Sequence, residues 1–144
     1  MPTSAERGDD RWAVDTSVAI AALDATHAAH AECRQVVSER RPRLSGHAAF
    51  ETVSVLTRMP GTRAIAPSDA LDLVNAVFPD PLWLSTADTA DLYGRLRTLG
   101  ISGGAVYDAL VGSAATAHGH RLLTRDLRAR RTYDLLGVDT VYLG

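Results

Sequence analysis

The chain has 144 residues, of which 46% are hydrophobic and 22% charged, and its formal net charge is −2 at pH 7; these proportions are typical of one globular domain. The single cysteine, Cys33, excludes an intrachain disulfide and a multi-cysteine zinc site and favours a reducing, cytoplasmic location. All 15 basic residues are arginines, which excludes Schiff-base chemistry and P-loop phosphate binding because both need a lysine.

Short apolar runs alternate with helical segments along most of the chain. Residues 1–11 are polar and aperiodic, so we predict a flexible tail there and a single domain over residues 12–144. The predicted strands are Trp12 to Val14, Arg43 to Leu44, Leu82 to Leu84, Arg121 to Leu123 and Thr140 to Leu143. The predicted helices are Val18 to Leu23, His27 to Arg40, His47 to Met59, Pro67 to Val77, Thr86 to Leu99, Gly104 to His118 and Leu127 to Leu136. This alternation predicts an α/β fold with a short parallel sheet of four to five strands and about seven helices.

The apolar stretch nearest the N-terminus is a poor candidate for a membrane segment. It runs from Trp12 to Leu23, is interrupted by Asp15, and has neither the length of a membrane span nor the flanks of a signal peptide. We therefore expect no membrane association.

Two acidic residues follow predicted strands directly. Asp15 ends the first strand, and Asp126 lies just beyond the fourth. In an open parallel sheet, ligands bind outside the carboxyl ends of the strands, near the point where the strand order reverses. The sequence therefore predicts that Asp15 and Asp126 lie at such a site.

Two further acidic residues occur on apolar stretches of predicted helices. Glu51 shares a helix face with Ala48 and Val55, and Asp108 lies among Ala, Val, Leu and Gly residues. A half-buried carboxylate needs a cation, an arginine or a proton, because burial disfavours its charge. Taken singly, each of these acids is equally well explained as a helix cap or an ion pair.

Together, the four carboxylates predict a cation site. At about 4 Å and an effective dielectric near 20, two carboxylates repel by about 4 kcal/mol, so a positive charge must lie among them. Oxygen ligands without cysteine or clustered histidine favour Mg²⁺ or Mn²⁺ over zinc. We assign Asp15, Asp108 and Asp126 to metal binding, and Glu51 to the metal shell or to orienting a water molecule.

At these residues the sequence resembles the PIN-domain family and, within it, the VapC-type toxins of bacterial toxin–antitoxin pairs. The resemblance covers nearly the whole chain after the tail and rests on a set of motifs. These are Val14-Asp15-Thr16-Ser17-Val18, Ala49-Phe50-Glu51-Thr52-Val53, Tyr107-Asp108-Ala109-Leu110-Val111, Arg121 to Ala129, and then Tyr133, Gly137 and Val138.

The resemblance implies a PIN-like three-layer fold and a metal-dependent endoribonuclease that cleaves structured RNA. Its catalytic acids carry over as Asp15, Glu51, Asp108 and Asp126. Hydroxyl positions that orient carboxylates or the water of the metal in relatives carry over as Thr16, Ser17 and Thr124. The resemblance also implies a cognate antitoxin, which often inserts an arginine into the acidic pocket, and a homodimeric toxin.

The charge distribution favours RNA as a partner. Without the four candidate site acids, 13 acidic residues face 15 arginines. Arg125 and Arg128 follow the fourth strand and are candidates for RNA contacts. We interpret Trp12, Trp83 and Tyr93 as packing residues rather than platforms for base stacking.

Two rival functions stay open at this point. One is a catalytically silent binding module whose acidic pocket receives an arginine from a partner protein. The other is a phosphoaspartate signalling domain, which the absence of lysine disfavours. A cleavage assay separates the first from a nuclease, and labelling with acetyl phosphate tests the second.

Overall fold

A four-stranded, fully parallel sheet forms the centre of the protein in a computed structural model that describes residues 11–144. The strands are short and largely buried, as expected of a parallel sheet packed between helices. They are β1 (Trp12–Val14), β2 (Arg43–Leu44), β3 (Arg121–Thr124) and β4 (Thr140–Tyr142), in the spatial order β2-β1-β3-β4. The predicted α/β class and parallel sheet are therefore confirmed.

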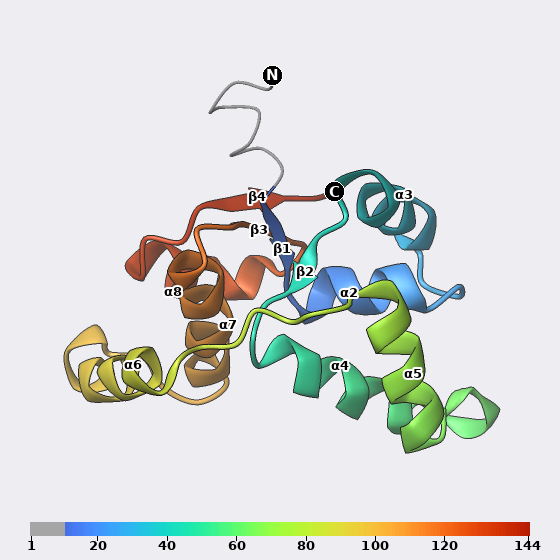
Figure 1. Ribbon diagram of the computed structural model, residues 1–144, viewed down its shortest axis with the longest axis horizontal. Helices are drawn as coiled ribbons and strands as arrows, with labels where there is room; N and C mark the ends of the chain where they lie inside the picture. The colour runs from blue at the N-terminus through green and yellow to red at the C-terminus, as the bar shows by residue number, and fades with distance from the viewer. Residues whose placement is uncertain (1–10) are drawn as a thin grey trace.

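Seven α-helices and two short 3-10 helices surround the sheet in the described residues (Figure 1). The α-helices are α2 (Thr16–Leu23), α3 (His30–Arg40), α4 (Ala48–Thr57), α5 (Pro67–Val77), α6 (Thr86–Leu99), α7 (Ala105–Ala117) and α8 (Arg130–Leu135). The 3-10 helices are η1 (Gly61–Arg63) and η2 (Leu127–Ala129). In Figure 1, α5 and α6 lie at opposite ends of the long axis with the sheet between them. None of these helices is long and apolar enough to cross a membrane.

The strand order reverses between β1 and β3. From β1 the chain passes to β2 on one side, whereas β3 pairs with the other side of β1, with Val14 opposite Leu123. The carboxyl ends of β1 and β3 are therefore neighbours, and the amide of Asp15 donates to the Leu123 carbonyl at 3.3 Å. This places the residues that follow both strands at one edge of the sheet.

The prediction of a strand over Leu82 to Leu84 is wrong. Only Leu82 forms a bridge, to Ser45. Pro81 has no amide hydrogen to donate, and the Trp83 carbonyl contacts His118 Nε2 at 2.7 Å instead of a strand. The ladder therefore stops after one residue.

Most predicted helix boundaries lie within two residues of the observed ones, and two predicted helices differ by more. Helix α3 begins at His30 instead of His27, because the Asp24 side chain accepts from the Thr26 amide at 2.9 Å and His27 Nδ1 accepts from the Ala29 amide at 3.0 Å. Such local bonds compete with a helical backbone. The predicted helix from Leu127 divides into η2 and α8.

A close contact between the β2–α4 turn and α7 brings two of the candidate acids toward each other. Gly46 has φ of +51°, and a Cβ atom there would lie 2.9 Å from the Ala114 Cβ, so only glycine fits. The buried Ser45 hydroxyl donates to the Val111 carbonyl at 2.6 Å across the same contact. The start of α4, which carries Glu51, is thereby fixed against α7, which carries Asp108.

The predicted packing role is confirmed for Trp12, which is 5% exposed, and is wrong for Trp83 and Tyr93, which are 50% and 79% exposed. Trp12 lies on the central strand, whereas Trp83 lies on a connection after the bridge at Leu82. The predicted flexible tail falls almost wholly on residues 1–10, which lie outside the described part of the chain.

Candidate active site at the carboxyl edge of the sheet

Asp15 is the buried centre of the candidate site. It is 4% exposed and caps α2, with Oδ1 accepting from the Val18 amide at 3.3 Å and from the Ser17 hydroxyl at 2.5 Å. Its Oδ2 accepts from the Thr124 hydroxyl and from Tyr133 Oη at 3.0 Å. Burial raises the pKa of Asp15, and the hydroxyl and amide donors oppose that rise. The ionised form is thus held by donors from α2, β3 and α8.

Two hydroxyls connect this buried carboxylate to the loop after β3. Ser17 Oγ accepts from the Arg125 amide at 2.8 Å, and Thr124 Oγ1 accepts from the Asp126 amide at 3.1 Å. Each hydroxyl therefore donates to Asp15 and accepts from the loop that presents Asp126. Asp126 itself caps η2, with Oδ1 accepting from the Arg128 amide at 3.0 Å.

The carboxyl groups of Asp108 and Glu51 lie within electrostatic range of Asp15 and Asp126. Burial, followed by the negative charges of Asp126, Glu51 and Asp15, raises the pKa of Asp108 to about 6. Burial, followed mainly by the charge of Asp15, also raises the pKa of Glu51. Because the charges of Asp15 and Asp126 act on both Asp108 and Glu51, the structure brings the four predicted acids within electrostatic range of one another.

The donor set fits a hard divalent cation. Among residues 11–144, no three acidic, histidine or cysteine side chains are close enough to form a ready-made cage. Mg²⁺, however, keeps several waters and uses only one or two carboxylates directly. The Thr16 hydroxyl is buried beside the Glu51 carboxylate and has no hydrogen bond of good geometry. Raised carboxyl pKa values are a feature that a bound cation and its waters would relieve.

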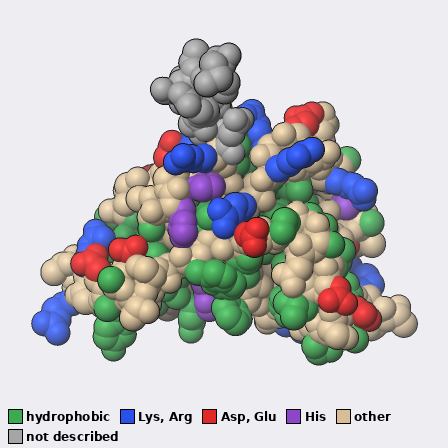
Figure 2. Space-filling view, viewed as in Figure 1, with side chains coloured by type: hydrophobic (Ala, Val, Ile, Leu, Met, Phe, Trp, Pro, Cys, Tyr) green, Lys and Arg blue, Asp and Glu red, His purple; other side chains and the backbone are tan. Residues whose placement is uncertain are grey.

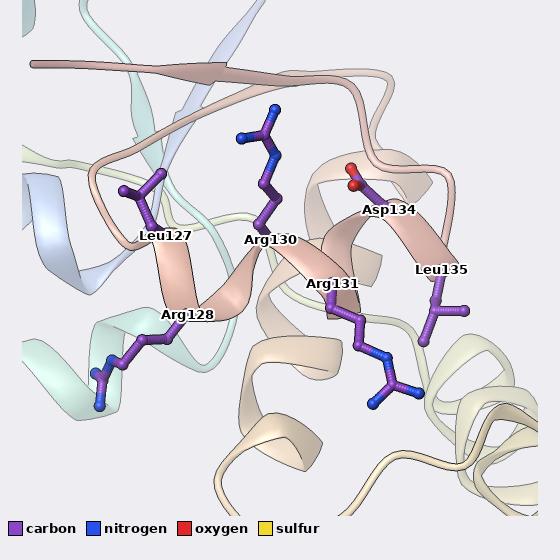
Figure 3. Close-up of a pocket in the computed structure, with 6 residues that line it drawn as sticks. All are labelled: Leu127, Arg128, Arg130, Arg131, Asp134 and Leu135. Carbon is purple, nitrogen blue, oxygen red and sulfur yellow. The ribbon is translucent and has the colours of Figure 1, made fainter.

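The two arginines predicted to contact RNA occupy different environments. The Arg128 side chain is 94% exposed, and its Nε lies 3.4 Å from Asp126 Oδ1. Arg125 instead directs its guanidinium toward the C-terminal residue, since a Cβ on Gly144 would lie 3.4 Å from its Nη2, and its Nε is buried. Arg128, Arg130 and Arg131 all line a surface hollow on η2 and α8, and Figure 3 shows the Arg128 side chain pointing away from the other two. Of the two candidates, Arg128 has the position suited to a substrate contact.

Tyr133 is the site residue that the sequence did not predict as such. It is 1% exposed and reaches Asp15 from α8. The lone aromatic in the segment Arg130-Arg131-Thr132-Tyr133-Asp134 was the available signal, but an isolated aromatic in a polar helix indicates burial without indicating what its hydroxyl contacts.

A short parallel α/β domain with carboxylates gathered at its strand-order reversal is the architecture of a PIN domain, and the PIN domain family model matches residues 13–135. Ribonuclease VapC27 of Mycobacterium tuberculosis (strain H37Rv) is 50% identical over 129 residues, which cover 90% of this chain and 94% of that protein. Ribonuclease VapC40 of Mycobacterium tuberculosis (strain CDC 1551) is 41% identical over 128 residues, which cover 88% of this chain and 95% of that protein. The chain therefore belongs to the PIN-domain family, as a VapC-type ribonuclease toxin.

Proposed function

We propose that the protein is an endoribonuclease that hydrolyses structured RNA with Mg²⁺, or Mn²⁺ in its place, held by Asp15, Glu51, Asp108 and Asp126 directly or through water. The observation that carries this proposal is the pKa of Asp108, which burial and then the charges of Asp126, Glu51 and Asp15 raise to about 6. A site that disfavours its own ionisation binds a divalent cation at the expense of bound protons.

A bound cation lowers the pKa of its water and offsets the negative charge of the scissile phosphate. The residues of the chain supply the arrangement around it. Asp15 holds Ser17 and Thr124, whose hydroxyls fix the loop of Asp126. Glu51, which is half-buried on α4, is suited to orient the attacking water. Exposed Arg128 is suited to contact a phosphate next to the cleaved one.

The test is cleavage of a total RNA pool by the purified protein with Mg²⁺, with Mn²⁺ and with EDTA. We expect internal cuts with either metal, no cuts in EDTA, and a loss of at least a hundredfold in Asp108→Asn. Asp72→Asn, an exposed carboxylate on α5, is the matched control and should cleave like the wild type. Cleavage that persists in EDTA would contradict the role of the metal.

We further propose that a cognate antitoxin inhibits the enzyme and that the toxin forms a homodimer. An excess of carboxylates in the site favours an inhibitor that supplies an arginine, because bidentate pairing with a carboxylate is strong. Coexpression with the cognate antitoxin should yield a complex that cleaves RNA only after the antitoxin is removed. Light scattering on the isolated toxin should give twice the mass of one chain.

A further inference from the structure

Four ring side chains form a continuous row across the ends of α4 and α7. The rings of His47 and Tyr107 stack with centroids 4.9 Å apart and planes 16° apart. His47 also stacks with Phe50 at 6.1 Å, and Phe50 contacts Trp83 at 5.7 Å. We call Tyr107, His47, Phe50 and Trp83 the ring row.

The ring row is open to solvent. Phe50 is 66% exposed, Tyr107 51% and Trp83 50%. Figure 2 shows hydrophobic side chains gathered along the lower middle of one face of the molecule. A contiguous exposed group of large aromatic rings is uncommon on a monomer and marks a binding surface.

One end of the ring row adjoins the candidate active site. Phe50 directly precedes Glu51 on α4, and Tyr107 directly precedes Asp108 on α7. The His47–Tyr107 pair therefore bridges the two helices that carry these acids. An RNA strand with its phosphate at the carboxylates would therefore lie on the same two helices that carry Phe50 and Tyr107.

The other end of the ring row adjoins cationic side chains. Trp83 and Arg43 line the same surface hollow, and the Trp83 carbonyl lies 2.7 Å from His118 Nε2. Burial lowers the pKa of His120, and its neighbours Arg43, His118 and Arg11 add to this effect, so these four side chains form one group. In Figure 2, histidine and arginine side chains lie above the hydrophobic area. Positive charge next to exposed rings is complementary to the phosphates and bases of a nucleic acid.

We propose that the ring row binds unpaired nucleotides of the RNA substrate by base stacking and so selects looped or single-stranded segments next to the cleaved bond. This inference rests on the proposed cleavage of RNA. It assigns the four rings to substrate selection, whereas the carboxylates carry out the chemistry. A duplex cannot use the row, because its bases are already stacked on one another.

The rival occupant of this surface is a second copy of the chain. A mostly apolar groove adjoins Phe50 and Trp83, lined also by Ala49, Val53, Leu71 and Val74, and apolar grooves are common in protein interfaces. The arginines beside the exposed rings at the Trp83 end favour RNA, because positive charge next to exposed rings is complementary to both the phosphates and the bases of a nucleic acid.

The test measures RNA binding in EDTA, where the metal-dependent reaction is switched off. The probes are fluorescein-labelled 12-nucleotide oligo(A) and oligo(U) and a blunt RNA duplex, followed by anisotropy. Phe50→Leu, Trp83→Leu and Tyr107→Leu keep an apolar side chain but remove the ring, and each should weaken binding of the single strands by about tenfold or more. Phe50→Tyr should bind like the wild type, and the duplex should bind weakly to every variant.

Tyr93→Leu is the matched control, since Tyr93 is 79% exposed and joins no ring pair in residues 11–144. Unchanged single-strand binding in all three leucine variants overturns the proposal. A change from dimer to monomer in light scattering in these variants also overturns it and assigns the surface to contact between copies. The separate Mg²⁺ cleavage assay distinguishes failure of this inference from failure of the proposed nuclease activity.

Discussion

Tyr133 Oη donates a hydrogen bond of 3.0 Å to Asp15 Oδ2 and so joins residues 118 positions apart in the chain. Tyr133 lies on α8, beyond the last candidate acid, and is 1% exposed. The bond connects the residue that directly follows β1 to a helix that follows β3. Helix α8, in the C-terminal part of the domain, thus contacts the buried side of the acidic site.

Tyr133→Phe removes this donor and leaves the ring in place. Because the buried Asp15 carboxylate loses a hydrogen bond to its charged form, we expect a loss of about 1–3 kcal/mol in the free energy of unfolding at pH 7. Urea denaturation measures it. Tyr93→Phe, which removes an exposed hydroxyl from α6, should change the free energy of unfolding by less than about 0.5 kcal/mol. Equal stability of the two variants would argue against the importance of the Tyr133 bond.

Gly112→Ala tests the packing that holds Tyr133 in position. An added Cβ would lie 2.8 Å from Val138 Cγ2 and 3.0 Å from Tyr133 Cδ1. Overpacking of this kind costs about 1–3 kcal/mol, which exceeds the helix propensity that alanine gains over glycine, about 1 kcal/mol. We expect a net loss of stability in thermal and urea unfolding.

Gly94→Ala is the internal comparison for that substitution. Gly94 lies within α6, and an added Cβ there has no neighbour within 4 Å. The helix propensity then acts without a clash, so this variant should gain up to about 1 kcal/mol. A stabilised Gly112→Ala would mean that the helices around Tyr133 can move apart at little cost.

The sequence was informative about the sheet because its strands are short apolar runs, and the helices between them begin and end at recognisable proline and glycine residues. Helices α5 and α6 were predicted at their observed bounds; Pro67 opens α5, and Gly100 ends α6. The 82–84 strand failed because a buried leucine after a proline satisfies the same pattern with a single bridge. Local composition does not reveal how many residues of a run are paired.

The four acids could be selected from the sequence because a carboxylate in apolar surroundings is unusual, and strand ends in an open sheet converge. Tyr133 and the ring row could not be found in this way. The role of Tyr133 depends on a contact across 118 residues. The ring row combines α4, the 82–84 segment and α7, and the exposure of Trp83 depends on the chain leaving the sheet there. The assignment of site residues and the single-domain boundary stay predictions.

The pH dependence of stability should reveal the coupled acids in metal-free buffer. Burial and the charges of Asp126, Glu51 and Asp15 raise the pKa of Asp108 to about 6 from its ordinary value of 3.8. A carboxyl with a raised folded-state pKa holds its proton more tightly when folded, so stability falls as the pH rises from about 4 to about 6 and is then constant. After screening, Asp108 should contribute on the order of 1 kcal/mol to this fall.

Asp108→Asn isolates that contribution. The difference in the free energy of unfolding between wild type and variant, measured with urea at intervals from pH 4 to 7.5 in EDTA, should grow with pH in favour of the variant and level off above about 6. Using the difference removes the contributions of other acids, such as Asp24, whose pKa is lowered. A difference that is independent of pH would contradict the raised pKa of Asp108.

Divalent metal should stabilise the folded protein at neutral pH. Binding to the folded state alone adds about 2.7 kcal/mol when the ion is at a hundred times its Kd, which corresponds to several degrees in Tm for a domain of this size. We expect Mg²⁺ or Mn²⁺ at millimolar concentration to raise the Tm of the wild type, and Asp108→Ala and Asp126→Ala to show a smaller rise. The Tm of Asp72→Asn should rise as much as that of the wild type. A wild-type Tm that changes with neither Mg²⁺ nor Mn²⁺ would count against the metal site.

Asp126→Asn separates the electrostatic cost of the site from its structure. Asparagine can still accept the hydrogen bond from the Arg128 amide that Asp126 Oδ1 accepts at 3.0 Å, so the cap of η2 is retained. The substitution removes a negative charge that raises the pKa of both Asp108 and Glu51. In EDTA at pH 7 the variant should therefore be more stable than the wild type by about 1 kcal/mol, and its Tm should respond less to Mg²⁺. Asp134→Asn, an exposed change on α8, controls for the loss of one charge and should alter neither quantity. If Asp126→Asn is no more stable than the wild type without metal, the carboxylates do not repel one another enough to require a cation.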